Sequence, residues 1–160
     1  MADFGIEGLQ ALSIQINNAL KEQGIISQEI IDNHQPASQQ EVQRIYAQGY
    51  QAWLADDYVA AMADFSWLTI HCPLEFRFHL ALAGAMQMQQ EYGLALSAYT
   101  CALLLEAKDP EPVYQMAICL RALEKGADAR EALQTAIEMS YLSPEYAPIA
   151  EKASLLLNQI

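Results

Sequence analysis

The amino-acid sequence predicts an all-α fold made of three similar helical hairpins. The first observation is a 34-residue period, in which small residues recur at Ala61, Ala95 and Ala129. The second is that apolar residues recur at steps of three and four, the spacing of one helix face. The third is that no segment favours a strand, since the short apolar run 69–72 lies inside the helical period.

Further positions follow the same period. The aligned residues are Gly49, Ala83 and Ala117 upstream of the alanines, and Phe65, Tyr99 and Leu133 downstream of them. A 34-residue period with small residues in two phases and a bulky residue in a third is typical of tetratricopeptide repeats. Small side chains let the two antiparallel helices of a hairpin approach closely, and the bulky one fills the gap to the next hairpin. We therefore predict three tetratricopeptide hairpins.

Residues 1–37 lie outside the repeat frame and are expected to form a helical extension. Its first 25 residues carry an apolar stripe at helical spacing, made of Ile6, Leu9, Leu12, Ile16 and Leu20. Gly24 is a plausible stop for this helix, and Ser27 can cap a short second one. The stripe must be buried either on the repeats or on a second copy of the chain. Because the repeats have a core of their own, we expect the stripe to mediate self-association.

The tetratricopeptide domain is expected to span 38–160. Its repeats are placed at about 42–75, 76–109 and 110–143, and its hairpin helices at about 39–55, from 57 to about 71, 74–90, 92–106, 111–124 and 127–140. The segment 38–41 has the pattern of a capping box, which begins the first of these helices. The turn at Lys125 and Gly126 departs from the general repeat consensus. A last helix over 144–158, which Ser143 and Pro144 should begin, is expected to cover the open end of the third repeat.

Composition limits the partners that this chain can bind. It has 20 acidic residues against 8 Lys and Arg, a formal net charge of −12, which repels phosphate backbones and anionic lipid. We therefore expect no nucleic-acid binding. We also expect no stable membrane insertion, because no apolar run reaches the roughly 18 residues that a membrane span requires. The N-terminus lacks the basic start and apolar block of a signal peptide. Hydrophobic residues make up 53% and charged ones 18%, so part of the apolar surface should be exposed in an interface or a groove.

The sequence contains no pattern that would support catalysis, a cofactor or a metal. It has no phosphate loop, no zinc-protease motif and no nucleophile elbow. The histidines and cysteines are scattered over different elements without a CxxC pair: His34, His71, His79, Cys72, Cys101 and Cys119. We expect the cysteines to be small apolar core residues in a reducing compartment. The protein is therefore expected not to be an enzyme.

The repeat frame also predicts which side chains face the groove, because the first helix of each hairpin lines the concave face of a tetratricopeptide stack. The expected groove residues, which would bind a partner, are Tyr46, Tyr50, Trp53, Arg77, Leu80, Gln87, Tyr114, Ile118 and Arg121. Tyr46, Tyr50 and Trp53 fall on one stripe of one helix, and such side chains suit a partly wet recognition surface. The alternative is that they pack against the N-terminal helices. Residues at these positions lack the Lys, Asn and Arg pattern that clamps the C-terminal carboxylate of heat-shock proteins.

Several short segments carry a more specific resemblance. They are 46–50 (YAQGY), 64–68 (DFSWL), 80–84 (LALAG), 111–115 (EPVYQ) and 129–132 (AREA). In these segments the chain resembles the class II chaperones of bacterial type III secretion systems, over about residues 40–142 well and over the N-terminal 35 in outline. The resemblance implies groove aromatics at Tyr46, Tyr50 and Trp53 and dimerisation through the N-terminal helices.

The resemblance also implies a function. Such a cytoplasmic bacterial chaperone would bind an apolar segment of a secreted translocator or membrane-directed effector in its concave groove, keeping it soluble and unassembled until export. The alternative function is that of a general scaffold or regulatory adaptor, which docks folded partner proteins through the same face. A chaperone's client should become insoluble or degraded without it, whereas an adaptor's partner should survive alone.

Overall fold

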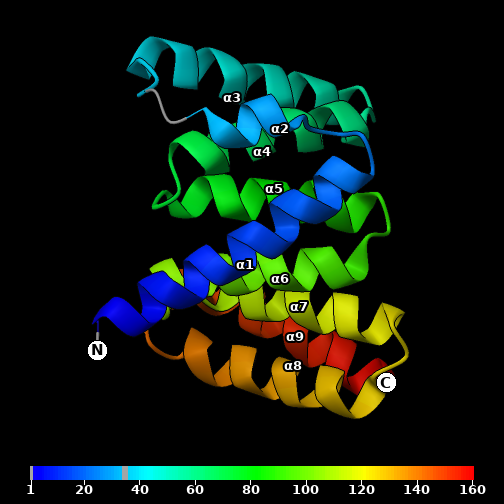
Figure 1. Ribbon diagram of the computed structural model, residues 1–160. Coiled ribbons are helices and arrows are strands. Elements are labelled where there is room, and N and C mark those ends of the chain that lie inside the picture. The colour runs from blue at the N-terminus through cyan, green and yellow to red at the C-terminus, as the bar shows by residue number, and fades with distance from the viewer. Residues whose placement is uncertain (1, 34–35) are drawn as a thin grey trace. The chain divides into compact units, whose positions relative to one another are not determined.

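The computed structural model describes residues 2–33 and 36–160, with side chains from residue 5 onward. Its secondary structure over these ranges is entirely helical, which confirms the all-α prediction (Figure 1). The chain divides into two compact units that meet between Leu105 and Glu106. The first unit contains α1 (Ala2–Glu22), α2 (Gln28–Asp32), α3 (Gln39–Leu54), α4 (Tyr58–His71), α5 (Phe76–Met88) and α6 (Tyr92–Leu105). The second contains α7 (Pro110–Ala122), α8 (Gly126–Ser140), the 3₁₀ turn η1 (Pro144–Tyr146) and α9 (Ala147–Gln159).

Short polar side chains begin several of these helices by accepting a hydrogen bond from an otherwise unpaired backbone amide. The Oγ atom of Ser38 accepts from the amide of Glu41 at 3.1 Å, and Ser27 begins α2 in the same way. Ser143 differs from the prediction, because its side chain makes no capping bond and the α-helix begins only at Ala147. A helix running from 144 would carry Pro148 in its interior, where proline removes a backbone bond and clashes with the preceding turn. The expected helix 144–158 is therefore a 3₁₀ turn followed by α9.

The turn inside each hairpin has the same backbone in all three repeats. Its first residue has a left-handed φ, at 59° for Asp56, 64° for Gln90 and 62° for Glu124. In each turn the next amide donates to the carbonyl five residues back at 2.9 Å: Asp57 to Ala52, Glu91 to Met86, and Lys125 to Leu120. This arrangement is the Schellman motif, which satisfies the last carbonyls of a helix. The third turn therefore keeps the repeat geometry although its sequence departs from the consensus.

The small residues that recur in the repeat frame are buried in the structure. Ala61, Ala95 and Ala129 are fully buried. A Cβ atom on Gly49 of α3 would come within 2.5 Å of the ring of Phe65 on α4. Since no real Cβ contact is that short, only glycine allows α3 to lie directly on that ring. The ring of Phe65 on α4 therefore lies directly against α3 at Gly49.

Helix α1 packs against α6 within the first unit, where the two lie side by side (Figure 1). Leu9, Ile16 and Leu20 are buried there, whereas Leu12 is half-buried and Ile6 is exposed. The sequence allowed the apolar stripe to be buried either on the repeats or on a second copy of the chain. In the structure, most of the stripe is buried within the chain itself. Three of the five residues expected to bind a second copy are occupied within the chain. Self-association itself stays a prediction.

In the second unit, α7 and α8 form a hairpin, and α9 packs against α8 as expected of a capping helix. Ala136 of α8 and Ala153 of α9 are both fully buried. The expected domain boundary between residues 37 and 38 stays a prediction. Over the part of the chain that the structure describes, no helix combines the length and the apolar character that crossing a membrane demands.

Candidate functional site

Three aromatic residues of α3 line one cavity in the first unit. Tyr46, Tyr50 and Trp53 are four and three residues apart, so they share one side of the helix. The cavity has a volume of about 190 Å³, and its other walls are formed by Phe65 of α4 and by Arg77, Leu80, Ala81 and Gly84 of α5. Five of the predicted groove residues are thus brought together around one apolar space.

The rings of this cluster contact one another in edge-to-face and tilted arrangements. The ring centroids of Tyr46 and Tyr50 are 4.9 Å apart with an interplanar angle of 86°. Tyr50 also meets Phe65 at 5.4 Å and 66°, and Tyr46 meets Phe78 at 5.2 Å. Edge-to-face pairs of this kind are favourable because the positive edge of one ring faces the negative face of the other. The cavity walls are therefore held in place by contacts within the first unit.

Trp53 reaches across to α5 because residue 84 is glycine. A Cβ atom on Gly84 would lie 3.3 Å from Cη2 of the indole, closer than most such contacts. Trp53 also makes an edge contact with the ring of Tyr58, at 5.3 Å and 81°. The indole thus forms one end of the cavity, between α4 and α5.

The cavity is open to solvent at its aromatic side. Tyr50 is 42% exposed, Tyr46 and Trp53 are half-buried, and Phe65 is fully buried beneath them. The ring contacts that the three groove aromatics make with other helices are with residues of α4 and α5. These contacts agree with a partly exposed surface rather than with packing against the N-terminal helices. Whether the surface binds a client stays a prediction.

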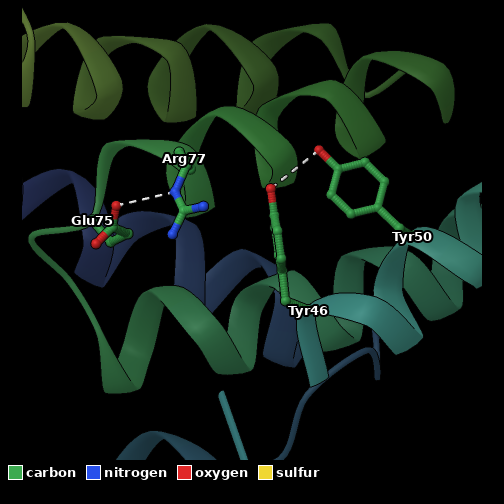
Figure 2. A network of polar contacts seen from close by, with 4 residues as sticks. All are labelled: Tyr46, Tyr50, Glu75 and Arg77. Carbon is green, nitrogen blue, oxygen red and sulfur yellow. Dashed lines mark hydrogen bonds and ion pairs between the residues drawn. The ribbon is translucent and has the colours of Figure 1, made fainter. Parts of the chain in front are cut away.

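Tyr46, Tyr50 and Arg77 bring polar groups to the cavity lining, and Figure 2 shows these groups together with Glu75. The Tyr46 hydroxyl donates to the Tyr50 hydroxyl at 3.5 Å. Burial, together with the hydrogen bond to Tyr50, raises the pKa of Tyr46 to about 12. Arg77 lies beside these rings, and its Nε donates to Oε1 of Glu75 at 3.3 Å. The cavity lining therefore offers hydrogen-bond donors next to an apolar space.

A second hollow of about 410 Å³ adjoins the first and shares Tyr46 and Arg77 with it. Its remaining walls include Gln43 of α3, Phe78 of α5 and Glu75 at the start of α5. The two spaces together extend along the α3 and α5 side of the first unit. A chain segment can therefore contact both.

Four of the predicted groove residues lie elsewhere. Gln87 does not line the cavity, and its Oε1 accepts a hydrogen bond from the Tyr99 hydroxyl at 2.6 Å. Tyr114, Ile118 and Arg121 are on α7 of the second unit, where the first two are half-buried and Arg121 is exposed. Their part in a groove stays a prediction.

Sequence reasoning missed that Phe65 and Phe78 take part in the site. Phe65 was assigned to the repeat core, and it is indeed fully buried, yet its ring also forms a wall of the cavity. Phe78 is buried as well and contacts Tyr46. The 34-residue period assigns one role to each position. It could not indicate that the ring of Phe65 belongs both to the repeat core and to the cavity wall. The only signal was that Phe78 directly follows the predicted groove residue Arg77.

The cysteines and histidines of the described ranges form no arrangement suited to a metal ion. No group of three or more His, Cys, Asp or Glu residues within residues 2–33 and 36–160 could hold one, and His34 lies outside those residues. Burial raises the pKa of Cys101 and of Cys119 to about 11 each. Burial also lowers the pKa of His79, which favours its neutral form.

Comparison with known proteins finds relatives of this chain in sequence and in fold. It matches no protein-family model. It is homologous to low calcium response locus protein H of Yersinia pseudotuberculosis, 26% identical over 121 residues that cover 74% of this chain and 71% of that protein. A chain of the CopN–Scc3 complex is 29% identical, with a TM-score of 0.70, over 74% of this chain and 70% of that one.

The fold is also that of the type III secretion chaperone SycD of Yersinia enterocolitica. The structure of SycD with a peptide of the translocator YopD superposes with a TM-score of 0.71 at 24% identity. The match covers 76% of this chain and 93% of SycD. SycD has also been solved as a dimer. These likenesses confirm the resemblance that the sequence segments indicated.

Proposed function

We propose that this protein is a chaperone of a bacterial type III secretion system. It binds an apolar segment of a secreted translocator or membrane-directed effector and keeps that client soluble and unassembled until export. The observation that carries the proposal is the partly exposed aromatic cavity between α3 and α5, on the helices that line the concave face of tetratricopeptide stacks. The chain acts in the cytoplasm, as a homodimer, without cofactor or catalysis.

The size and lining of the cavity suit a single client side chain. A cavity of about 150 Å³ in a protein core holds one benzene molecule. The volume here, about 190 Å³, therefore accommodates one aliphatic or small aromatic side chain. Its walls are Tyr, Trp, Phe, Leu, Ala and Gly with one Arg, a lining that is largely apolar. An apolar anchor side chain of the client would therefore transfer from water into this cavity.

The mechanism that follows is occlusion. Burying one aliphatic side chain contributes about 1.5–3 kcal/mol, so a client segment needs several anchors along the groove. Ordering the segment offsets part of this gain, which leaves a reversible affinity suited to release at export. While bound, the apolar stretch is unavailable to membranes and to other copies of the client. The relatives support this reading, because SycD has been solved with a peptide of a translocator.

Co-purification from the native host tests the proposal. The tagged protein should retain a secreted partner with an apolar segment, and that partner should become insoluble or degraded when the chaperone gene is deleted. Restoring the parent chain should rescue the partner, whereas a chain with Tyr50→Ser and Trp53→Ser should not. A partner that stays soluble and abundant without this protein would instead support the adaptor function.

A further inference from the structure

Arg77 places a positive charge beside the aromatic cavity. The whole chain has 8 Lys and Arg against 20 Asp and Glu, and up to residue 105 the basic residues are Lys21, Arg44 and Arg77. Among the residues that line the cavity, Arg77 is the one that carries a charge. A cation at an apolar site of an otherwise acidic protein indicates that the site also recognises a polar or charged group of its ligand.

The guanidinium of Arg77 is held in place by its neighbours. Its central carbon lies 5.6 Å from the ring centroid of Tyr46 and 5.7 Å from that of Phe78, within the range of cation–π attraction. Glu75 is at the N-terminal cap position of α5, yet its carboxylate makes no capping bond and instead accepts from Nε of Arg77. Both interactions orient the side chain, which reduces the entropy that it would lose on binding a partner.

The two terminal nitrogens of Arg77 are the groups left for a partner. Within the described residues, the polar contact of this side chain uses Nε alone (Figure 2). The side chain is 62% exposed, so Nη1 and Nη2 can be reached from solvent. A guanidinium presents its donors in a planar fork that matches the two oxygens of a carboxylate. The geometry therefore suits a carboxylate that approaches while Glu75 keeps its bond to Nε.

The position of Arg77 determines how far along a bound segment such a carboxylate lies from the apolar anchor. Arg77 borders both the cavity of about 190 Å³ and the adjoining hollow of about 410 Å³. A segment that fills the cavity and continues into the hollow must pass the guanidinium. In an extended segment, side chains two residues apart point to the same side and are separated by about 6.6 Å. One side chain can thus enter the cavity while the second reaches Arg77.

We propose that this site recognises a client segment in which an Asp or Glu side chain lies about two residues from an apolar anchor. The apolar side chain fills the aromatic cavity, and the carboxylate pairs with Nη1 and Nη2 of Arg77. Elsewhere the net charge of −12 repels acidic side chains of the client, so the pair at Arg77 sets the register of the bound segment. This inference rests on the proposed function, whose client it specifies.

Selection from a library of short random peptides, capped at both ends, tests the inference on the full chain. The parent should enrich sequences with an apolar residue and a nearby Asp or Glu. In the selected peptides, replacing that residue by Asn or Gln should weaken binding by about tenfold or more, as for other hydrogen bonds to charged groups. Arg77→Gln should bind the acidic and the amide peptides equally, and Arg77→Lys should keep part of the preference because it keeps the charge.

Arg44→Gln is the matched control, because Arg44 is also exposed and lies on α3, where it borders a different hollow. It should keep the full preference for acidic peptides, and melting curves should show all the variants folded. Equal binding of the acidic and amide peptides by the parent would overturn the inference. The inference also fails if Arg44→Gln loses the preference as completely as Arg77→Gln.

A variant that combines Tyr50→Ser and Trp53→Ser separates this inference from the proposed function. If peptides bind through the cavity but show no preference for a carboxylate, only the inference about Arg77 fails. If the parent selects no peptide with an apolar anchor, or if the double variant binds the selected peptides as tightly as the parent, the cavity is not a client site. In that case both fail.

Discussion

Replacing Tyr50 and Trp53 together by serine should abolish client binding while the chain stays folded. The change removes the ring contacts of Tyr50 with Tyr46 and with Phe65, and that of Trp53 with Tyr58. Each such contact is worth about 0.5–1.5 kcal/mol beyond the apolar area that the rings bury, so the three contacts alone come to about 3 kcal/mol of unfolding free energy. Two fully buried aromatics would cost about 6–10 kcal/mol instead. Because domains of ordinary size have about 5–15 kcal/mol of stability, the variant should remain native at moderate temperature.

The effect on binding should be larger than the effect on folding. Aromatic anchors in a binding site commonly contribute about 2 kcal/mol or more each, and two of them correspond to about a thousandfold change in Kd. The measurement is a thermal melt by circular dichroism, followed by anisotropy titration with the labelled client segment well below the melting temperature. The matched control is Tyr141→Ser with Leu142→Ser, which removes an equally apolar pair that is 80% and 65% exposed and does not line the cavity.

The control pair should leave both the melting temperature and the client affinity close to the parent's. A folded Tyr50 and Trp53 variant that binds the client with the parent's Kd would refute the assignment of the cavity as the client site. A variant that is unfolded at low temperature would refute the energetic argument, since it would mean that the two rings belong to the core.

Three further outcomes test the repeat framework and the N-terminal helix. Gly49→Ala should lower the free energy of unfolding by about 1–3 kcal/mol in a denaturant titration, because its Cβ atom would overlap the ring of Phe65. Gln90→Gly should raise the melting temperature, because its φ of 64° is strained for any residue with a side chain, while Gln89→Gly, at a φ of −85°, should lower it. Ile14→Asp changes a residue of α1 that is 61% exposed. If the exposed face of α1 mediates self-association, light scattering should give a smaller particle with an unchanged melting temperature, and an unchanged mass would exclude that face.

The helices were predictable because their signals are local. The 34-residue period and the capping residues placed most of the hairpin helix ends within one or two residues of where they lie. The exception, the start of α9, depends on Pro148, whose clash with the preceding turn outweighs the capping pattern at Ser143 and Pro144. The left-handed turn residues Asp56, Gln90 and Glu124 were also missed. None of them is glycine, so residue type gave no hint of their backbone, although they stand one period apart.

The candidate site was predictable only in part. Tyr46, Tyr50 and Trp53 share one helix face because of their spacing, which is a property of the chain itself. That they enclose a cavity depends on α4 and α5, since Phe65 forms a wall and the missing side chain at Gly84 leaves room for the indole. Such contacts join residues that are far apart in the sequence, and no periodicity encodes how deep or how open the space between them is.

The apolar stripe of α1 is an example of what the sequence determined and what depended on the tertiary structure. The spacing of Leu9, Ile16 and Leu20 was enough to establish an amphipathic helix, because a helix face follows from the 3.6-residue turn alone. The surface that covers this face was not determined by the sequence, because burial against a hairpin and burial against a second copy remove the same apolar area from water. Only the packing of α1 on α6 decided between them, since it buries these three side chains within one chain and leaves Ile6 and Ile14 exposed.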